Sequence, residues 1–119
     1  MFRLVNTERA KAGLNLVSFD NSLRDVAREH SDDMFSRGYF SHQSLEGLSP
    51  FDRMEDAGID FAYAGENLAL APSTPLAMQG LMNSRGHRDN ILSPNFNKIG
   101  IGVIDGGIYG KMYSQEFSN

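Results

Sequence analysis

The residues of this sequence best suited to chemistry at neutral pH are its histidines and one acid in an apolar stretch. The histidines are His30, His42 and His87, and the acid is Glu66, within the apolar stretch 61–71. Imidazole can transfer protons or bind a metal near neutral pH, whereas a carboxylate in apolar surroundings needs hydrogen-bond donors or a cation. No two histidines have the i, i+4 spacing of a helical zinc motif, so spacing alone defines no site.

Each candidate also has a purely structural interpretation. His30 lies on the expected buried face of a helix, where a histidine usually packs and forms hydrogen bonds, so we exclude it from the site. His42, in a loop after that helix, can face a cleft or pack against aromatic residues. His87, near a helix start, can bind a ligand or cap the helix. Glu66 can belong to a functional site, or it can accept hydrogen bonds from backbone N–H groups and so tie its strand to a neighbouring helix.

Other polar groupings favour no site. The acids at 32–33 and at 52, 55 and 56 lie on expected helices, where neighbouring carboxylates are usually solvated surface. Ser84 precedes His87 by three residues, but this segment is not a nucleophile elbow, and no acid is placed to complete a triad. A serine hydrolase is therefore a weak interpretation.

Composition excludes several classes of protein. The net charge is −4, with a pI near 5.2 and no basic run, which argues against binding to nucleic acid. The chain has no cysteine, so it has neither disulfides nor thiolate metal sites. It also lacks both a segment of about 20 apolar residues that would span a membrane and the features of a signal peptide. Because helix begins almost at once, we expect Met1 to start a domain trimmed from a longer precursor.

Periodicity and cap residues predict an α+β domain covering residues 1–119, with helices packed on a mainly antiparallel sheet. We expect a short helix ending at Gly13, a connection at 14–19, and a helix from Asp20 or Asn21 to Gly38 that buries Leu23, Val26, Ala27, His30 and Met34. A third helix should run from Ser49-Pro50 toward Gly58. A fourth should begin at Thr74-Pro75 and bury Leu76, Met78, Leu81 and Met82, and a further helical turn should run through 86–92. Residues 61–71 should be extended but interrupted by a polar site, and 99–103 and 108–117 should form a hairpin around Asp105-Gly106-Gly107.

Several motifs, taken in order, resemble the CAP superfamily (cysteine-rich secretory protein, antigen 5, pathogenesis-related 1; SCP-like), in its bacterial, YkwD-like branch. They are Ala27-Arg28-Glu29-His30-Ser31, Gly38-Tyr39-Phe40-Ser41-His42, Gly65-Glu66-Asn67, Asn83-Ser84-Arg85-Gly86-His87-Arg88 and the glycine-rich hairpin. The resemblance implies an α-β-α sandwich with a large cleft, in which His42, Glu66 and His87 match the family's polar residues. It also implies a secreted protein, extracellular or in the cell envelope. The second acid of the family's tetrad falls at Ser84, so that tetrad is incomplete.

This pattern favours a binding module whose cleft, with His42, Glu66, Asn67, Ser84 and His87, holds a lipid, peptide or cell-wall fragment. The alternative is a hydrolase in the same cleft, with acid–base chemistry or with Zn²⁺ held by His42 and His87 and assisted by Glu66. A third interpretation is that these polar residues only stabilise the fold.

Overall fold

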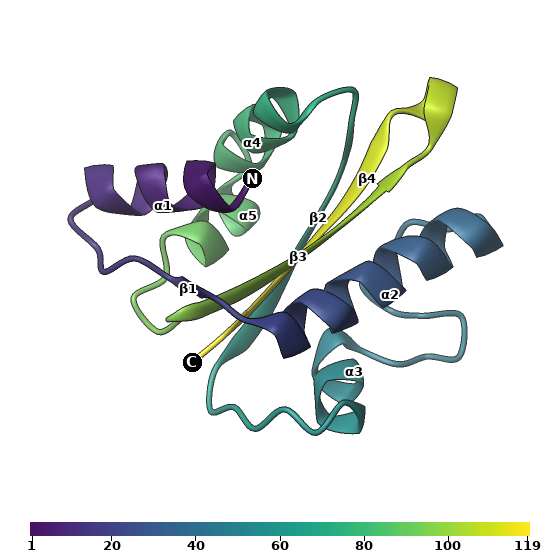
Figure 1. The fold of residues 1–119 in the computed structure, drawn as a ribbon, viewed down its shortest axis with the longest axis horizontal. Coiled ribbons are helices and arrows are strands. Elements are labelled where there is room, and N and C mark those ends of the chain that lie inside the picture. The colour runs from purple at the N-terminus through teal and green to yellow at the C-terminus, as the bar shows by residue number, and fades with distance from the viewer.

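The computed structural model describes residues 1–119, which form helices, strands and one 3₁₀ turn in a three-layer arrangement (Figure 1). In chain order the elements are α1 (Phe2–Lys11), β1 (Ser18–Phe19), α2 (Asn21–Arg37), α3 (Pro50–Asp56), β2 (Ala64–Ala71), α4 (Thr74–Met82), α5 (Arg85–Ile91), β3 (Lys98–Asp105), a 3₁₀ turn (Gly107–Tyr109) and β4 (Lys111–Ser118). No helix combines the length and the apolarity needed to cross a membrane.

The central sheet has the strand order β1-β3-β4-β2. β4 pairs antiparallel with both β3 and β2, and β1 pairs parallel with β3. The expected sandwich with a mainly antiparallel sheet is therefore confirmed, but the sheet is mixed because of β1. β2, which carries Glu66, lies at an open edge of the sheet.

Helices cover both faces of the sheet (Figure 1): α2 and α3 on one side, and α1, α4 and α5 on the other. The larger apolar core lies on the second side, where Val5 of α1 meets Leu81 of α4 and Ile99 of β3. Smaller clusters under α2 and α3 are built around Leu23 and Met34. Because the sheet alternates its side chains between these layers, each strand contributes to both.

Local signals explain where most helices begin and end. The Asp20 side chain accepts a hydrogen bond from the Leu23 N–H at 2.9 Å, which caps α2, and Gly38 ends that helix with φ 71°. Ser49 and Asp52 form the reciprocal capping box of α3. These boundaries confirm the predictions from cap residues, since a cap depends on neighbours only three residues away.

Some expectations are wrong. Residues 18–19, expected in a connection, form β1, and the strand expected to be interrupted runs unbroken through Glu66. Ser73, not Thr74, caps α4, whose Leu76 is 51% exposed instead of buried. Residues 108–109, expected in a strand, lie in the turn between β3 and β4. In each case tertiary contacts or hydrogen-bond geometry override the local pattern.

Candidate functional site

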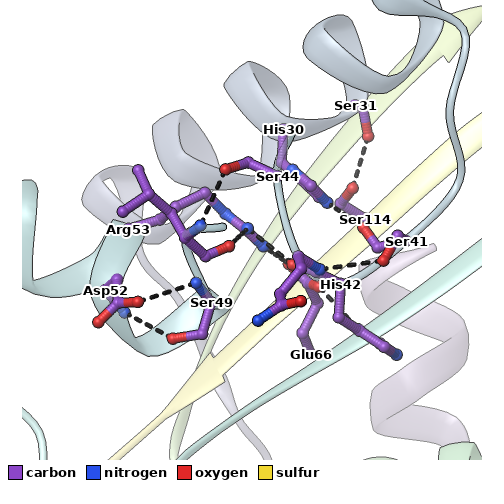
Figure 2. A network of polar contacts seen from close by, with 12 residues as sticks. His30, Ser31, Ser41, His42, Ser44, Ser49, Asp52, Arg53, Glu66 and Ser114 are labelled. Atoms are coloured by element: carbon purple, nitrogen blue, oxygen red, sulfur yellow. Dashed lines mark hydrogen bonds and ion pairs between the residues drawn. The ribbon is translucent and has the colours of Figure 1, made fainter. Parts of the chain in front are cut away.

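Glu66 is the centre of a buried polar network (Figure 2). Alternation along β2 directs its side chain toward the α2–α3 layer, where the carboxylate is 1% exposed. Its Oε1 lies 2.8 Å from His42 Nδ1, and its Oε2 accepts a hydrogen bond from Arg53 Nη2 at 2.6 Å. The carboxylate thus has the donors that its burial requires.

The Arg53 guanidinium joins this network to the loop that carries His42. Its Nη1 donates to the backbone oxygens of His42 at 2.7 Å and of Leu48 at 3.1 Å. Since α3 is held at its start by the capping box, Arg53 fixes this loop at His42 and at Leu48. His42 is thereby held at its backbone and at its ring.

The His42 ring has one engaged and one free nitrogen. An ionised carboxylate only accepts hydrogen bonds, so Nδ1 donates its proton to Glu66. The imidazole is 54% exposed, and Nε2 has no partner in the protein. Carboxylates that bind one imidazole nitrogen fix the tautomer and orient the other nitrogen, here toward solvent.

A second acid, Glu116, lies beside Glu66. The two residues face each other across β2 and β4, and Glu116 is fully buried with no N–H donor to either carboxyl oxygen. Burial, then the hydrogen bond to Glu66 and the charge of Glu66, raise the pKa of Glu116 well above its usual value. Burial also acts to raise the pKa of Glu66, but hydrogen bonds from Glu116 and His42 and the charge of Arg53 outweigh it and lower that pKa. Of the two acids, Glu116 therefore holds its proton more strongly and Glu66 ionises first.

His87 lies on the other side of β2, in the first turn of α5. Its Nδ1 lies 2.7 Å from Ser84 Oγ, and Ser84, although at the N-cap position of α5, makes no capping hydrogen bond. Burial, and then the charge of His42, lower the pKa of His87. The Ser84 hydroxyl is thus bound to the His87 side chain instead of capping α5.

Asn67 supports this second side instead of joining the Glu66 network. Adjacent residues on a strand point to opposite faces, and the Asn67 amide, 1% exposed, points toward α5. Its Nδ2 donates to the His87 backbone oxygen at 3.0 Å and to Gln115 Oε1 at 3.1 Å, while its Oδ1 accepts from Asn90 at 2.9 Å. Asn67 therefore fixes the backbone of His87.

An apolar groove of about 440 Å³ runs along β2 between Phe40 and α4, and His87 and Ser84 lie in its wall. Neither His42 nor Glu66 lines it, although Phe40 belongs to the same loop as His42. The predicted site residues therefore form two groups: His42 with Glu66, and His87 with Ser84 and Asn67.

The largest cavity, about 530 Å³, lies elsewhere, between α2, α3 and the loop at 44–48. Acidic side chains dominate its lining, among them Glu29, Asp32 and Asp56. His30 also borders it, is 2% exposed, and donates from Nε2 to the Ser41 oxygen at 2.8 Å. The interpretation of His30 as a hydrogen-bonded packing residue is confirmed.

These residues do not fit a catalytic zinc centre, which uses three protein ligands and an open position. No three His, Asp or Glu side chains are arranged to hold a metal ion. The Glu66 carboxylate is shared by His42, Arg53 and Glu116, so it orients His42 instead of serving as a third ligand. Binding of Zn²⁺ by His42 and His87 alone stays a prediction.

Arg53 and Glu116 are the residues of this site that sequence reasoning did not select. Glu116 follows the polar residues Ser114 and Gln115, so hydropathy does not mark it as buried; its only signal is that Gln115-Glu116-Phe117 resembles a motif of the family. Arg53, before Ala57-Gly58, matches a flanking motif of the family, but its contact with Glu66 depends on how the loop after α2 folds back onto α3.

Comparison with known proteins identifies the family. The model of the CAP family, the cysteine-rich secretory protein family, matches residues 2–117. The chain belongs to this family. Its CAP domain therefore accounts for nearly all of the sequence.

Relatives agree with this assignment. The chain is 44% identical over 115 residues to YkwD of Bacillus subtilis, a match that covers 96% of this chain and 44% of YkwD. This confirms the resemblance to the bacterial branch of the CAP superfamily. The chain spans less than half the length of the curated relatives it matches.

Two solved structures share the fold. An extracellular protein of Bacillus anthracis with an SCP domain superposes with a TM-score of 0.90 at 39% identity, covering 99% of this chain and 38% of that one. An outer surface protein of Borrelia burgdorferi gives a TM-score of 0.92 at 21% identity, covering 99% of this chain and 88% of its own. The second likeness concerns the fold alone.

Proposed function

We propose that this CAP domain is a ligand-binding module, and that its ligand contacts His42 and His87 and lies in the groove along β2. The observation that carries the proposal is the pair of partly exposed imidazoles, each held through Nδ1 so that its Nε2 is free, of which His87 lines an apolar groove that also contacts Phe40 of the His42 loop. Sites that bind small ligands combine an apolar lining with a few fixed polar groups. A lipid, a peptide or a cell-wall fragment would satisfy both requirements.

We also propose an extracellular or cell-envelope location. The relative from Bacillus anthracis is described as an extracellular protein. Ligands available there include peptidoglycan fragments, lipids and secreted peptides.

The proposal is tested by NMR titration of ¹⁵N-labelled protein with three probes: muropeptides from digested peptidoglycan, dodecanoate and a mixture of short peptides. At least one probe should shift the imidazole resonances of His42 and His87. Its Kd should rise about fivefold or more in the His42→Ala/His87→Ala variant, because each ring loses a hydrogen bond to the ligand. Gln43→Ala, an exposed change in the same loop, is the matched control. Binding by no probe, or equal binding by the double variant, would contradict the proposal.

The contact between Ser84 and His87 favours a second candidate, hydrolysis without a metal. The 2.7 Å separation is that of a nucleophile and its base. No acid binds the other nitrogen of His87, so the third member of a triad is missing, and this candidate ranks second. Hydrolysis of p-nitrophenyl acetate above the background rate, lost in Ser84→Ala, would support it; an equal rate in the variant would exclude it.

A further inference from the structure

The loop between α2 and α3, residues 40–48, contributes neither backbone pairing nor buried side chains to the rest of the protein. Its backbone–backbone hydrogen bonds are both internal: the Ser44 N–H donates to the Leu48 oxygen and the Gly47 N–H to the Ser44 oxygen, each at 2.9 Å. None of its residues is buried, and its largest apolar side chain, that of Phe40, is 52% exposed. The loop is thus a self-contained turn outside the three core clusters.

The connection between α5 and β3, residues 92–97, is attached in the opposite way. It buries Phe96, which is 7% exposed and stacks on Phe117 with the ring centroids 5.4 Å apart. Its Asn97 N–H donates to the Ser118 oxygen of β4 at 3.0 Å. Apolar packing and backbone pairing therefore hold that segment, whereas a segment with neither opens at a lower free-energy cost.

Side chains from outside the loop hold residues 40–48 in place (Figure 2). They bind only its polar groups: three backbone oxygens, the His42 imidazole and the Glu46 carboxylate. The four side chains that do so are His30, Arg37, Arg53 and Glu66. Water can replace each of these bonds when the loop moves away, and Glu66 keeps its hydrogen bond from Arg53 at 2.6 Å. Opening therefore leaves Glu66 paired and removes no residue from the core.

Open space borders the loop on both sides. Phe40 lines both the groove along β2 and a second apolar groove, of about 370 Å³. On the other side, the cavity of about 530 Å³ between α2 and α3 is lined by Ser44, Glu46 and Leu48. The ends of the loop are fixed, because Gly38 ends α2 and Ser49 caps α3. Movement is thus confined to residues 40–48, which have room on either side.

We infer that residues 40–48 form a flap, which opens to admit the ligand of the groove along β2 and closes over it with Phe40 and His42. The inference rests on the proposed function, because it concerns access to the same site. Phe40 lies in the wall of the groove and His42 binds Glu66 at 2.8 Å, so one movement of the loop displaces both contacts. Closure places the two groups of site residues, which the groove alone does not join, against one ligand.

Backbone ¹⁵N relaxation dispersion of the ligand-free protein tests the flap. Residues 40–48 should exchange between two states on the microsecond-to-millisecond timescale with one common rate, whereas α2 and α3 should not. Arg53→Lys loses the planar fork that binds two backbone oxygens of the loop, so the open fraction should rise about tenfold. Arg24→Lys is the matched control, because that guanidinium binds only Asn21 and Asp25 on its own helix, and it should leave the dispersion unchanged.

Closure is tested with whichever of the muropeptides, dodecanoate and short peptides binds in the titration described above. The bound probe should suppress the dispersion of residues 40–48. It should also dissociate about tenfold faster from Phe40→Ala, which removes the apolar contact of the flap with the groove. Phe51→Ala is the matched control, since Phe51 is 45% exposed on α3 and does not line the groove.

The outcomes separate the flap from the proposed function. Flat dispersion at residues 40–48 in the wild type, with order parameters equal to those of α2, would overturn the flap even if Arg53→Lys fails to fold. Dispersion that Arg53→Lys leaves unchanged, or a bound probe that neither suppresses it nor responds to Phe40→Ala, would also overturn the inference. Binding by no probe would contradict the proposed function, while the dispersion of the ligand-free protein decides separately whether the loop opens.

Discussion

At the scale of single residues, the site depends on two acids with different protonation. Glu66 and Glu116 share a cross-strand position, yet only Glu66 receives donors from His42 and Arg53. Two buried carboxylates in contact cannot both ionise without a large cost, so the acid without donors keeps its proton. The protonated Glu116 then donates to Glu66, and this keeps Glu66 available to orient His42.

Glu116→Gln tests this assignment through stability. An acid whose pKa is higher in the folded state takes up a proton on folding, so its contribution to stability falls as pH rises from its unfolded pKa near 4.5 toward the raised value. Glutamine has the same shape, and its amide N–H can donate to Glu66 without the uptake of a proton on folding. In urea denaturation at pH 7, we expect the free energy of unfolding of Glu116→Gln to exceed that of the wild type by about 1–2 kcal/mol.

The pH profile supplies the control for Glu116→Gln. Between pH 5 and 8 the wild type should lose more stability than the variant. Glu66, Arg53 and His30 are present in both proteins, so the difference between the two pH profiles belongs to Glu116. Glu55→Gln, an exposed change on α3, should leave the profile unchanged. A less stable variant with the wild-type profile would mean that Glu116 is ionised in the folded protein.

The residues of the site differ in how far sequence predicts them. Glu66 is marked by its apolar neighbours, and His42 and His87 are marked by family motifs. Arg53 reaches Glu66 only because a loop folds back, and the pairing of Glu66 with Glu116 is set by the register of β2 on β4. Register is a property of the assembled sheet, so no local pattern contains it.

At the scale of elements, α2 lies unusually close to β3. A Cβ atom at Gly100 would lie 2.1 Å from backbone atoms of Leu23 and Arg24, and one at Gly102 would lie 2.3 Å from those of Ala27 and Arg28. Glycine therefore permits the contact that brings the α2 layer, with its buried His30, onto the sheet. The sequence reveals the alternation of glycines but not their partner.

Paired glycine substitutions test this packing. Gly102→Ala should lower the free energy of unfolding by about 3 kcal/mol or more, because helix backbone cannot yield as a flexible side chain can. Gly80→Ala is the matched control: it lies inside α4 with no atom within 4 Å of its Cβ position, and it should stabilise by about 0.5–1 kcal/mol through helix propensity. Urea denaturation of both variants measures the difference. A tolerated Gly102→Ala would mean that α2 can move off β3.

At the scale of the whole molecule, family resemblance predicts the sandwich, but the contacts that close it are not visible in sequence. Cap residues and apolar periodicity place α2 and α3 because both signals are local. β1 has only two residues and exists because it pairs with β3, far along the chain. Arg9 is a similar case: a cation in an amphipathic helix looks like surface, yet it is 1% exposed.

Arg9 joins the first helix to the connection between α5 and β3. Its guanidinium donates to four backbone oxygens, those of Asn15, Ile91, Ser93 and Phe96, at 2.8–3.1 Å. A planar guanidinium can donate to all four oxygens at the same time, whereas an ammonium group has fewer donors and a different shape.

Arg9→Lys keeps the charge but removes most of the hydrogen bonds from Arg9 to these backbone oxygens, which leaves carbonyl groups buried without donors. We expect it to lower the free energy of unfolding by about 3 kcal/mol. Arg3→Lys, an exposed change on the same helix, should have almost no effect, and urea denaturation at pH 7 compares the two. Equal stability of both variants would show that α1 is held by its apolar contacts alone, so that Val5, not Arg9, fixes the helix on the α5 layer.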